Sequence, residues 1–286
     1  MTVLPTLPVP LPGIDRVTAA TVLAHAPSVH GTRPWRLETH GTGLALRTDP
    51  RQRLLATDPD SRDLRLSCGA ALLTLRLAVA AQGVRTVVTL LPDPARPRIV
   101  ATLYPAGVVQ PTSDETALFA AVPHRRSHRV PFAPRRVSAA HRLLLRRAAE
   151  VEGAWLHAVD EPDERRRVRD LLLQAHRHQW VDPGFRAEWR SRTPEPVQPG
   201  DRPARTDTDP SALLLVLGTR HDLPVAQLRA GQALQRVLLT ATALGLVSSV
   251  LSAATEVRVS REVLGRMYGP GLHPQIIVRV GHPADD

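Results

Sequence analysis

Two apolar stretches of this sequence match each other at a fixed spacing of 162 residues. When CGAALLTLRLAVAAQGV is aligned with AGQALQRVLLTATALGL, six of 17 positions are identical. A shared Ala and Leu content explains part of this match. It explains less well why two glycine pairs coincide, Gly69 with Gly231 and Gly83 with Gly245. We therefore expect an internal duplication, with two long helices packed at the centre of one chain that imitates a two-subunit assembly.

Helical and strand-like segments alternate along the chain without the regular strand–helix–strand rhythm of a parallel sheet. Helical spacing extends over about 64–82, which Gly83 ends, and over 161–180. Buried strands are expected at SALLLVLGT and PQIIVRVGHP. This pattern favours the α+β class. A chain of 286 residues that is 43% hydrophobic has enough apolar material for a large core.

Proline content and the duplication predict the domain boundaries. Residues 1–13 form a predicted Pro-rich arm, and residues 14–286 a domain with repeats at about 14–110 and 111–286. Within the second repeat, residues 181–210 are the least regular part of the chain. Connections of this length without secondary structure are uncommon in compact domains and often act as lids. We expect a lid here.

The net charge of +10 is typical of proteins that bind nucleic acid or an acidic membrane surface. All 37 basic residues are Arg, however, and the chain contains neither Lys nor Asn, which indicates the compositional bias of a GC-rich genome. The arginines are not interleaved with aromatic residues, and no helix-turn-helix pattern occurs. A nucleic-acid-binding protein is therefore the least favoured hypothesis.

Cysteine usage and hydropathy indicate a cytoplasmic protein. The single Cys68 can form no disulfide within the chain, and its Ala-rich surroundings predict a small buried hydrophobe. The proline-broken N-terminus lacks the basic start of a signal peptide. No stretch approaches the run of about 18 apolar residues that a membrane span needs.

The histidines do not predict a metal site. His176 and His178 are two residues apart and do not share a helix face. His124 and His128 have the spacing of one helix face, but no carboxylate or cysteine accompanies them.

The stretch VPHRRSHRVPF, residues 122–132, holds three arginines, two histidines and a serine. Taken alone it fits a nucleic-acid-binding strip, a cradle for one phosphate group or, most simply, a solvated surface loop. Arginine makes paired, charge-assisted hydrogen bonds to phosphate. The phosphate cradle is therefore favoured only if other parts of a phosphate-ligand site accompany this stretch.

Three further pieces do accompany it. They are APSVHGTRPWRL (26–37), GQALQRVLLTATALGLVSSVLS (231–252) and PQIIVRVGHP (274–283). In this order, the four pieces resemble the nitroreductase-like flavoproteins, which bind FMN. The stretch TDPDSRDLRLSCGAALLTLRLA (57–78) resembles the Acg-type branch, which occurs in actinobacteria. The resemblance covers about 15–282 and implies a nitroreductase-like fold, with one chain in place of the family dimer.

The resemblance implies that the arginine-rich stretch holds the phosphate end of FMN. Arg126, Ser127 and Arg129 match the family positions that bind the phosphate and the ribityl chain. Arg125 would add positive charge beside them.

Two other segments are expected at the flavin ring. Pro27 and Ser28 match the family segment that approaches the isoalloxazine. Val250, Leu251 and Ser252 stand where the family places a backbone N–H against flavin N5. Because a backbone group makes that contact, the side chains there can vary.

The sequence departs from the family pattern close to these positions. Gly31 stands where the family has Asn, and Arg33 stands where it has Gln, so an amide donor is lost and a cation is gained. Pro131 is inserted before Phe132. The basic tail that family members often carry after the last strand is replaced by GHPADD.

The resemblance implies an oxidoreductase that passes hydride from NAD(P)H through FMN to a small electrophilic acceptor, a nitroaromatic or a quinone. The flavin performs this chemistry, so no catalytic side chain is expected. Acg-type members also resemble flavin-sequestering proteins. In that alternative, the segment 181–210 covers the flavin with Glu188 and Trp189 and blocks NAD(P)H. In either case we expect a pseudo-dimeric monomer with no nucleic-acid or membrane partner.

Overall fold

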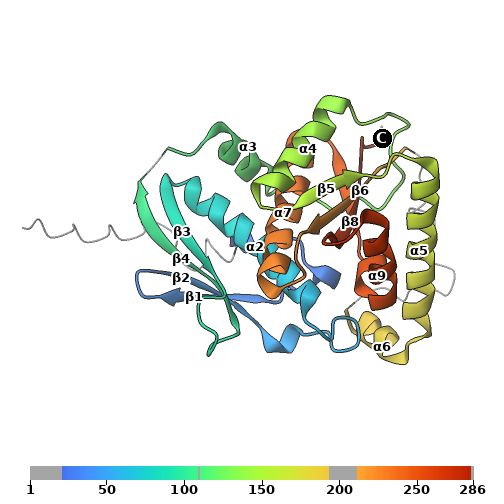
Figure 1. Ribbon diagram of the computed structural model, residues 1–286. Helices are drawn as coiled ribbons and strands as arrows, with labels where there is room; N and C mark the ends of the chain where they lie inside the picture. The colour runs from blue at the N-terminus through green and yellow to red at the C-terminus, as the bar shows by residue number, and fades with distance from the viewer. Residues whose placement is uncertain (1–20, 109, 193–210, 285–286) are drawn as a thin grey trace, which may run out of the picture.

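The computed structural model describes residues 21–108, 110–192 and 211–284. Two four-stranded sheets lie on either side of a central pair of helices, α2 (Arg62–Ala80) and α7 (Pro224–Ala243) (Figure 1). The expected arm at 1–13 and the larger part of the expected lid, 193–210, lie outside the described residues.

The first sheet is antiparallel and has the order β1-β2-β4-β3. Its strands are β1 (Trp35–His40), β2 (Gly43–Thr48), β3 (Val84–Leu90) and β4 (Ile99–Val108). The short helices η1 (Val29–Gly31) and η2 (Pro50–Gln52) precede β1 and follow β2. Helix α2 begins where it does because the Asp58 carboxylate accepts the N–H groups of Asp63 and Leu64, at 3.1 and 2.8 Å.

The second sheet has the order β5-β6-β8-β7 and is also antiparallel. Its strands are β5 (Trp155–Ala158), β6 (Leu213–Thr219), β7 (Val247–Leu251) and β8 (His273–Gly281). In both sheets the order is first, second, fourth, third, and the long helix connects the second strand to the third. This common topology is what the internal duplication predicts.

The two glycine pairs found in the sequence have separate structural roles. Gly69 and Gly231 lie where α2 crosses α7. A Cβ atom on Gly69 would lie 2.1 Å from the carbonyl oxygen of Leu228, and one on Gly231 would lie 2.0 Å from that of Leu66. The backbones therefore approach to a distance that only glycine allows.

The second pair ends the two helices. Gly83 has φ 76° and Gly245 has φ 72°. This left-handed conformation suits glycine, and it follows the last turn of many α-helices. The expected end of the helix at Gly83 is confirmed.

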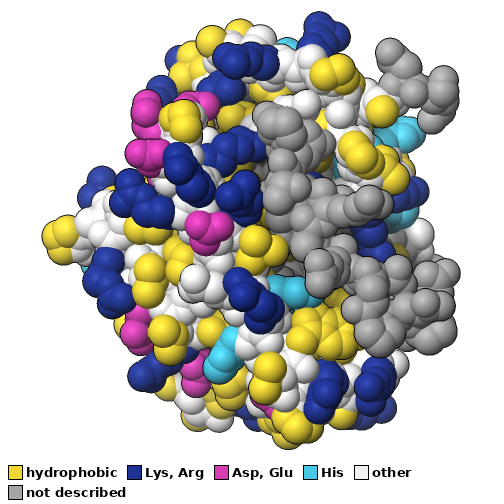
Figure 2. Space-filling view, turned by 90° about the vertical axis from the view of Figure 1, so that its right-hand side faces the viewer, with side chains coloured by type: hydrophobic (Ala, Val, Ile, Leu, Met, Phe, Trp, Pro, Cys, Tyr) yellow, Lys and Arg dark blue, Asp and Glu magenta, His cyan; other side chains and the backbone are white. Residues whose placement is uncertain are grey.

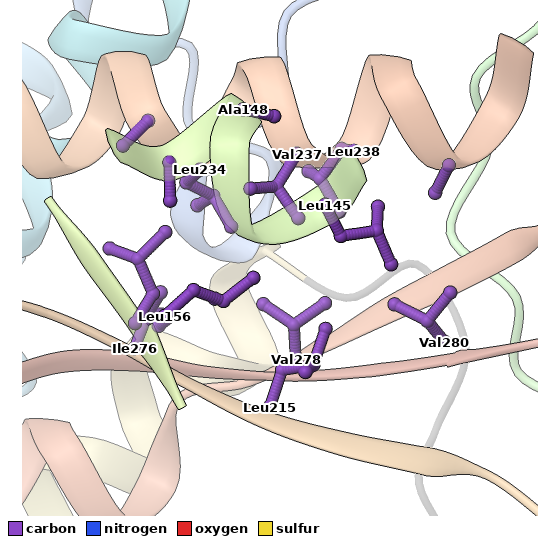
Figure 3. Close-up of a cluster of buried hydrophobic side chains, with 14 of the residues drawn as sticks. Leu145, Ala148, Leu156, Leu215, Leu234, Val237, Leu238, Ile276, Val278 and Val280 are labelled. Atoms are coloured by element: carbon purple, nitrogen blue, oxygen red, sulfur yellow. The ribbon is translucent and has the colours of Figure 1, made fainter. Parts of the chain in front are cut away.

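Helices cover both faces of the second sheet. On one face, α7 and α4 (Ala139–Val151) bury a leucine- and valine-rich cluster, in which Leu145, Val237 and Val278 meet (Figure 3). The opposite face packs against α5 (Pro162–Val181), α8 (Ala253–Glu256) and α9 (Arg258–Tyr268). Helix α3 (Ser113–Ala121) packs against α2 and α7.

The segment expected to be irregular is partly helical. Residues Pro183–Arg192 form α6, which follows α5 after a single residue. None of the helices in the described ranges is both long and apolar enough to cross a membrane. Among the described residues on the face in Figure 2, arginine side chains are spread out and are interrupted by hydrophobic and acidic ones.

Gly69→Ala tests the helix crossing. The added methyl group would press against the backbone of α7, and we expect the free energy of unfolding to fall by about 1–3 kcal/mol, as in other overpacked cores. Urea denaturation measures this change.

Gly265→Ala in α9 is the matched control, because its Cβ would meet nothing closer than 3.7 Å. Alanine is favoured over glycine inside a helix by about 0.5–1 kcal/mol, so this variant should be neutral or slightly stabilised. Equal stability of the two variants would contradict the account of the crossing.

Candidate functional site

The arginine-rich loop lies against β7. Ser127 forms a parallel bridge with Ser248, and the His128 N–H donates to the Ser248 carbonyl oxygen at 2.8 Å. Val250 and Leu251 are on the same strand, and Ser252 begins the turn into α8. The sequence predicts that the loop binds the phosphate end of FMN and that these three residues lie at its ring. In the structure, the loop and the three residues are close together along a single strand.

Phe132 anchors the end of this loop. The residue is 5% exposed, and its ring lies so close to Gly281 that a Cβ there would be 2.5 Å from it. The Arg279 guanidinium lies over the same ring, 5.3 Å from its centre, and donates to Ser249 Oγ at 2.8 and 3.0 Å. Arg279 is 3% exposed, so it supports the loop from β8.

The arginines of the loop have few partners. Arg126 donates to the carbonyl oxygens of Pro123 and Arg125, at 2.7 and 2.9 Å. In the part of the chain that the structure describes, no hydrogen bond or ion pair joins Arg125, Arg126 or Arg129 to a carboxylate. The Nε of Arg125 is buried without an acceptor. Burial, followed by the charge of Arg126, lowers the pKa of Arg125.

Pro27 and Ser28 lead into η1 in the first half of the chain. Ser28 Oγ accepts the Arg33 N–H at 3.0 Å, and the Val29 N–H donates to Ser67 Oγ at 3.1 Å. His30 and Arg33 have the positive φ values 51° and 47°. The two hydrogen bonds hold the backbone in this left-handed conformation. Arg33, which stands in place of the family's amide, is exposed.

The two predicted half-sites are connected through β7 and α8. The arginine-rich loop contacts Ser248 at one end of this stretch, and His30 contacts Glu256 at the other, with Nε2 3.4 Å from Oε1. No described hydrogen bond or ion pair joins Pro27 or Ser28 directly to the loop. A ligand that reached both segments would therefore lie along Val250, Leu251 and Ser252.

A buried polar cluster beneath η1 was not predicted. The Glu256 side chain is 2% exposed and receives hydrogen bonds from Gln179 and Ser252, and His30 Nε2 lies 3.4 Å from its Oε1. Burial would lower the pKa of His30, but the adjacent Glu256 carboxylate raises it above its ordinary value. Burial would likewise raise the pKa of Glu256, and His30 holds it low. Each of the two groups therefore favours the charged form of the other.

Asp63, at the start of α2, belongs to the same cluster. Burial raises its pKa to about 7, although the neighbouring Arg62 opposes this change. His30 stands inside a motif that was recognised in the sequence. Its acidic neighbours come from α2 and α8, so no local pattern could have indicated the cluster.

Helix α6 packs against this cluster. The Glu188 carboxylate accepts the N–H groups of Ala56 and Thr57 and the Thr57 hydroxyl, at 2.9, 3.0 and 2.9 Å. The Trp189 ring meets the His30 ring edge-on at 5.1 Å. A small pocket lies between η1, residues 54–57 and α6. The two residues expected to cover the flavin are thus placed beside His30.

Comparison with known proteins identifies the class. No family model matches the chain. A Mycobacterium tuberculosis protein named "Putative NAD(P)H nitroreductase Rv3131" is 32% identical over 292 residues, which cover 92% of this chain and 84% of that protein. "Putative NAD(P)H nitroreductase acg" from the same organism is 31% identical over 296 residues, covering 93% and 89%. A solved FMN-bound nitroreductase from Desulfitobacterium hafniense is 14% identical, with a TM-score of 0.44 over 59% of this chain and 90% of that one.

The identity and coverage of these relatives show that the protein is a member of the nitroreductase-like family. Within that family it belongs to the Acg-type branch, as the motifs in its sequence indicated. The two-sheet α+β architecture described above is therefore that of a member of this family.

Glu256→Gln tests the charged pair. Without that carboxylate, only the charges of Asp63 and Glu188 still oppose the effect of burial, so the pKa of His30 should fall below its wild-type value. An NMR titration of the His30 ring measures this fall, and an unchanged titration would contradict the account.

The same variant predicts a pH-dependent loss of stability. A pKa that is raised in the folded state contributes stability fully below the unfolded value, and this contribution is lost as the pH rises through the folded pKa. Glu256→Gln should therefore cost more free energy of unfolding at about pH 6 than at about pH 9. Glu262→Gln, which changes an exposed partner of Arg258 on α9, is the control and should show no such difference.

Proposed function

We propose that this protein is an FMN-binding NAD(P)H oxidoreductase of the nitroreductase type, with a small electrophilic acceptor, a nitroaromatic or a quinone. FMN, when bound, supplies the hydride transfer between the two substrates. The names of its relatives support NAD(P)H as the reductant. FMN-bound nitroreductases are among the solved structures that resemble this protein.

The arginine-rich loop is the observation that carries this proposal. Three arginines and a serine lie within five residues on a loop that Phe132 anchors. A phosphate dianion would supply the acceptors that the loop lacks, including one for the buried Nε of Arg125. Arg126 and Arg129 are exposed and can turn toward such a ligand. These residues fit the phosphate of FMN.

The edge of β7 supports the position of the flavin ring. The Ser248 carbonyl faces the loop, away from β8. Because backbone groups of an antiparallel strand alternate in direction with a period of two residues, the N–H of Val250 faces the same open edge. It is available as the donor that the family pattern places against flavin N5.

The segment before β1 would contact the ring from the first half of the chain. Ser28 Oγ already accepts the Arg33 N–H, but a hydroxyl that accepts one hydrogen bond still has its own proton to donate. Pro27 fixes the backbone in front of it. The residues that we assign to FMN are Pro27, Ser28, Arg125, Arg126, Ser127, Arg129, Val250, Leu251 and Ser252.

The contacts of α6 favour a second candidate function, storage of the flavin without turnover. Glu188 and Trp189 fasten α6 to residues 54–57 and to His30, beside the segment that would contact the ring. These contacts would hinder NAD(P)H from reaching the flavin.

Arg126→Ala and Arg129→Ala should each weaken FMN binding by about tenfold or more, because a hydrogen bond to a charged group contributes about 1.5–3 kcal/mol. Fluorescence titration of the flavin-free protein with FMN gives the Kd. Arg146→Ala, on the exposed side of α4, removes the same charge elsewhere and should leave the Kd unchanged. Wild-type affinity in both loop variants would refute the phosphate assignment.

Anaerobic mixing with NADPH or NADH distinguishes the two functions. A reductase should lose its flavin absorbance within seconds of mixing, because hydride transfer reduces the bound FMN. A storage protein should keep its colour until dithionite is added. Free FMN at the same concentration is the control, and Glu188→Gln, which loosens α6, should speed the bleaching only if α6 hinders access.

A further inference from the structure

A groove of about 810 Å³ opens at the edge of the second sheet. It lies over β5, between the start of α5 and the end of α9. Strand β5 is one edge of that sheet and β7 is the other, so the groove and the arginine-rich loop lie at opposite edges. Its volume falls in the range of about 300–1,000 Å³ that is usual for sites of small molecules.

Three rings form the wall of the groove. Trp155 and His157 project from the same side of β5, and Tyr268 ends α9. The Tyr268 ring centre is 5.6 Å from that of Trp155 and 5.1 Å from that of His157. The Trp155 indole is fixed, since its N–H donates to the Thr219 carbonyl oxygen at 3.2 Å.

The rings lie beside carboxylates from the first turn of α5. Glu164 accepts a hydrogen bond from His157 Nε2 at 3.0 Å, and its side chain is only 19% exposed. Burial raises the pKa of Tyr268, and the adjacent Glu164 raises it further, which keeps the phenol neutral. Glu161, which precedes the helix, is exposed at the rim of the groove.

The remaining charges of the groove contribute less. Asp163 is paired with Arg166 at 2.5 Å, and Arg167 and Arg220 are exposed. Water and salt screen exposed charges more than half-buried ones. Close to the rings, the carboxylate of Glu164 is therefore the dominant charge, in a chain whose net charge is +10.

We propose that this groove is a second ligand site, which binds an organic cation through an alkylammonium group. The faces of Trp155 and Tyr268 carry the negative side of the ring quadrupole, which attracts such a cation. The half-buried carboxylate of Glu164 adds charge attraction beside these rings. Neither the FMN site nor the reductase function is needed for this binding.

Choline and its uncharged carbon isostere, dimethylbutanol, test the proposal on the full-length protein. Calorimetric titration should show saturable binding of choline, and the isostere should bind at least about tenfold more weakly. Binding should also shift the indole N–H signal of Trp155 in NMR spectra, identified by its loss in Trp155→Phe. Equal affinity for the two compounds, no saturable binding of choline, or an unmoved Trp155 signal would overturn the proposal.

Glu164→Gln should lower the affinity for choline about tenfold and leave FMN binding unchanged. Asp170→Asn, which removes an exposed carboxylate further along α5, should bind choline like the wild type. An unchanged affinity in Glu164→Gln would contradict the role of this carboxylate. Because the comparison of choline with its isostere uses the wild-type protein, the test stands even if a variant folds poorly.

Discussion

The crossing of α2 and α7 at Gly69 and Gly231 is the contact on which the rest of the structure depends. At this point each helix lies against the backbone of the other, with no side chain between them. The first sheet is attached to α2 and the second to α7, so this crossing fixes the two halves relative to each other. The pairing of His30, from the first half, with Glu256, from the second, requires this close approach.

The segment from β7 to α8 links the parts of the candidate site. The arginine-rich loop is bound at Ser248, and η1 is bound at Glu256, so one short stretch of the second half is in contact with both. The loop itself is supported from beneath by Phe132 and Arg279. The proposed site would thus lie between the two halves of the chain, with Pro27 and Ser28 from the first half and the arginine-rich loop and Val250–Ser252 from the second.

Repeated and contiguous features could be predicted from the sequence. The glycine pairs indicated two long central helices, and Gly83 predicted the end of one of them. The crossing at Gly69 and Gly231 was not predicted, because it depends on how the two helices pack. The RRSHR stretch was recognisable because its residues are contiguous. The pair His30–Glu256 was not predicted, since its members lie on different elements and each has an ordinary neighbourhood in the sequence. The burial of Arg279 depends on Ser249 and Phe132, which only the folded sheet brings together. Helix α6 was missed because prolines and charged residues surround it.

The stoichiometry of FMN measured on the intact protein tests the central claim most directly. If the two halves of one chain form a single cofactor site, a spectrophotometric titration of the flavin-free protein should saturate at one FMN per chain. Light scattering on the same sample gives the number of chains in the particle. The ratio of one FMN per chain should hold whatever that number is. No saturable binding, or one FMN for every two chains, would contradict the account.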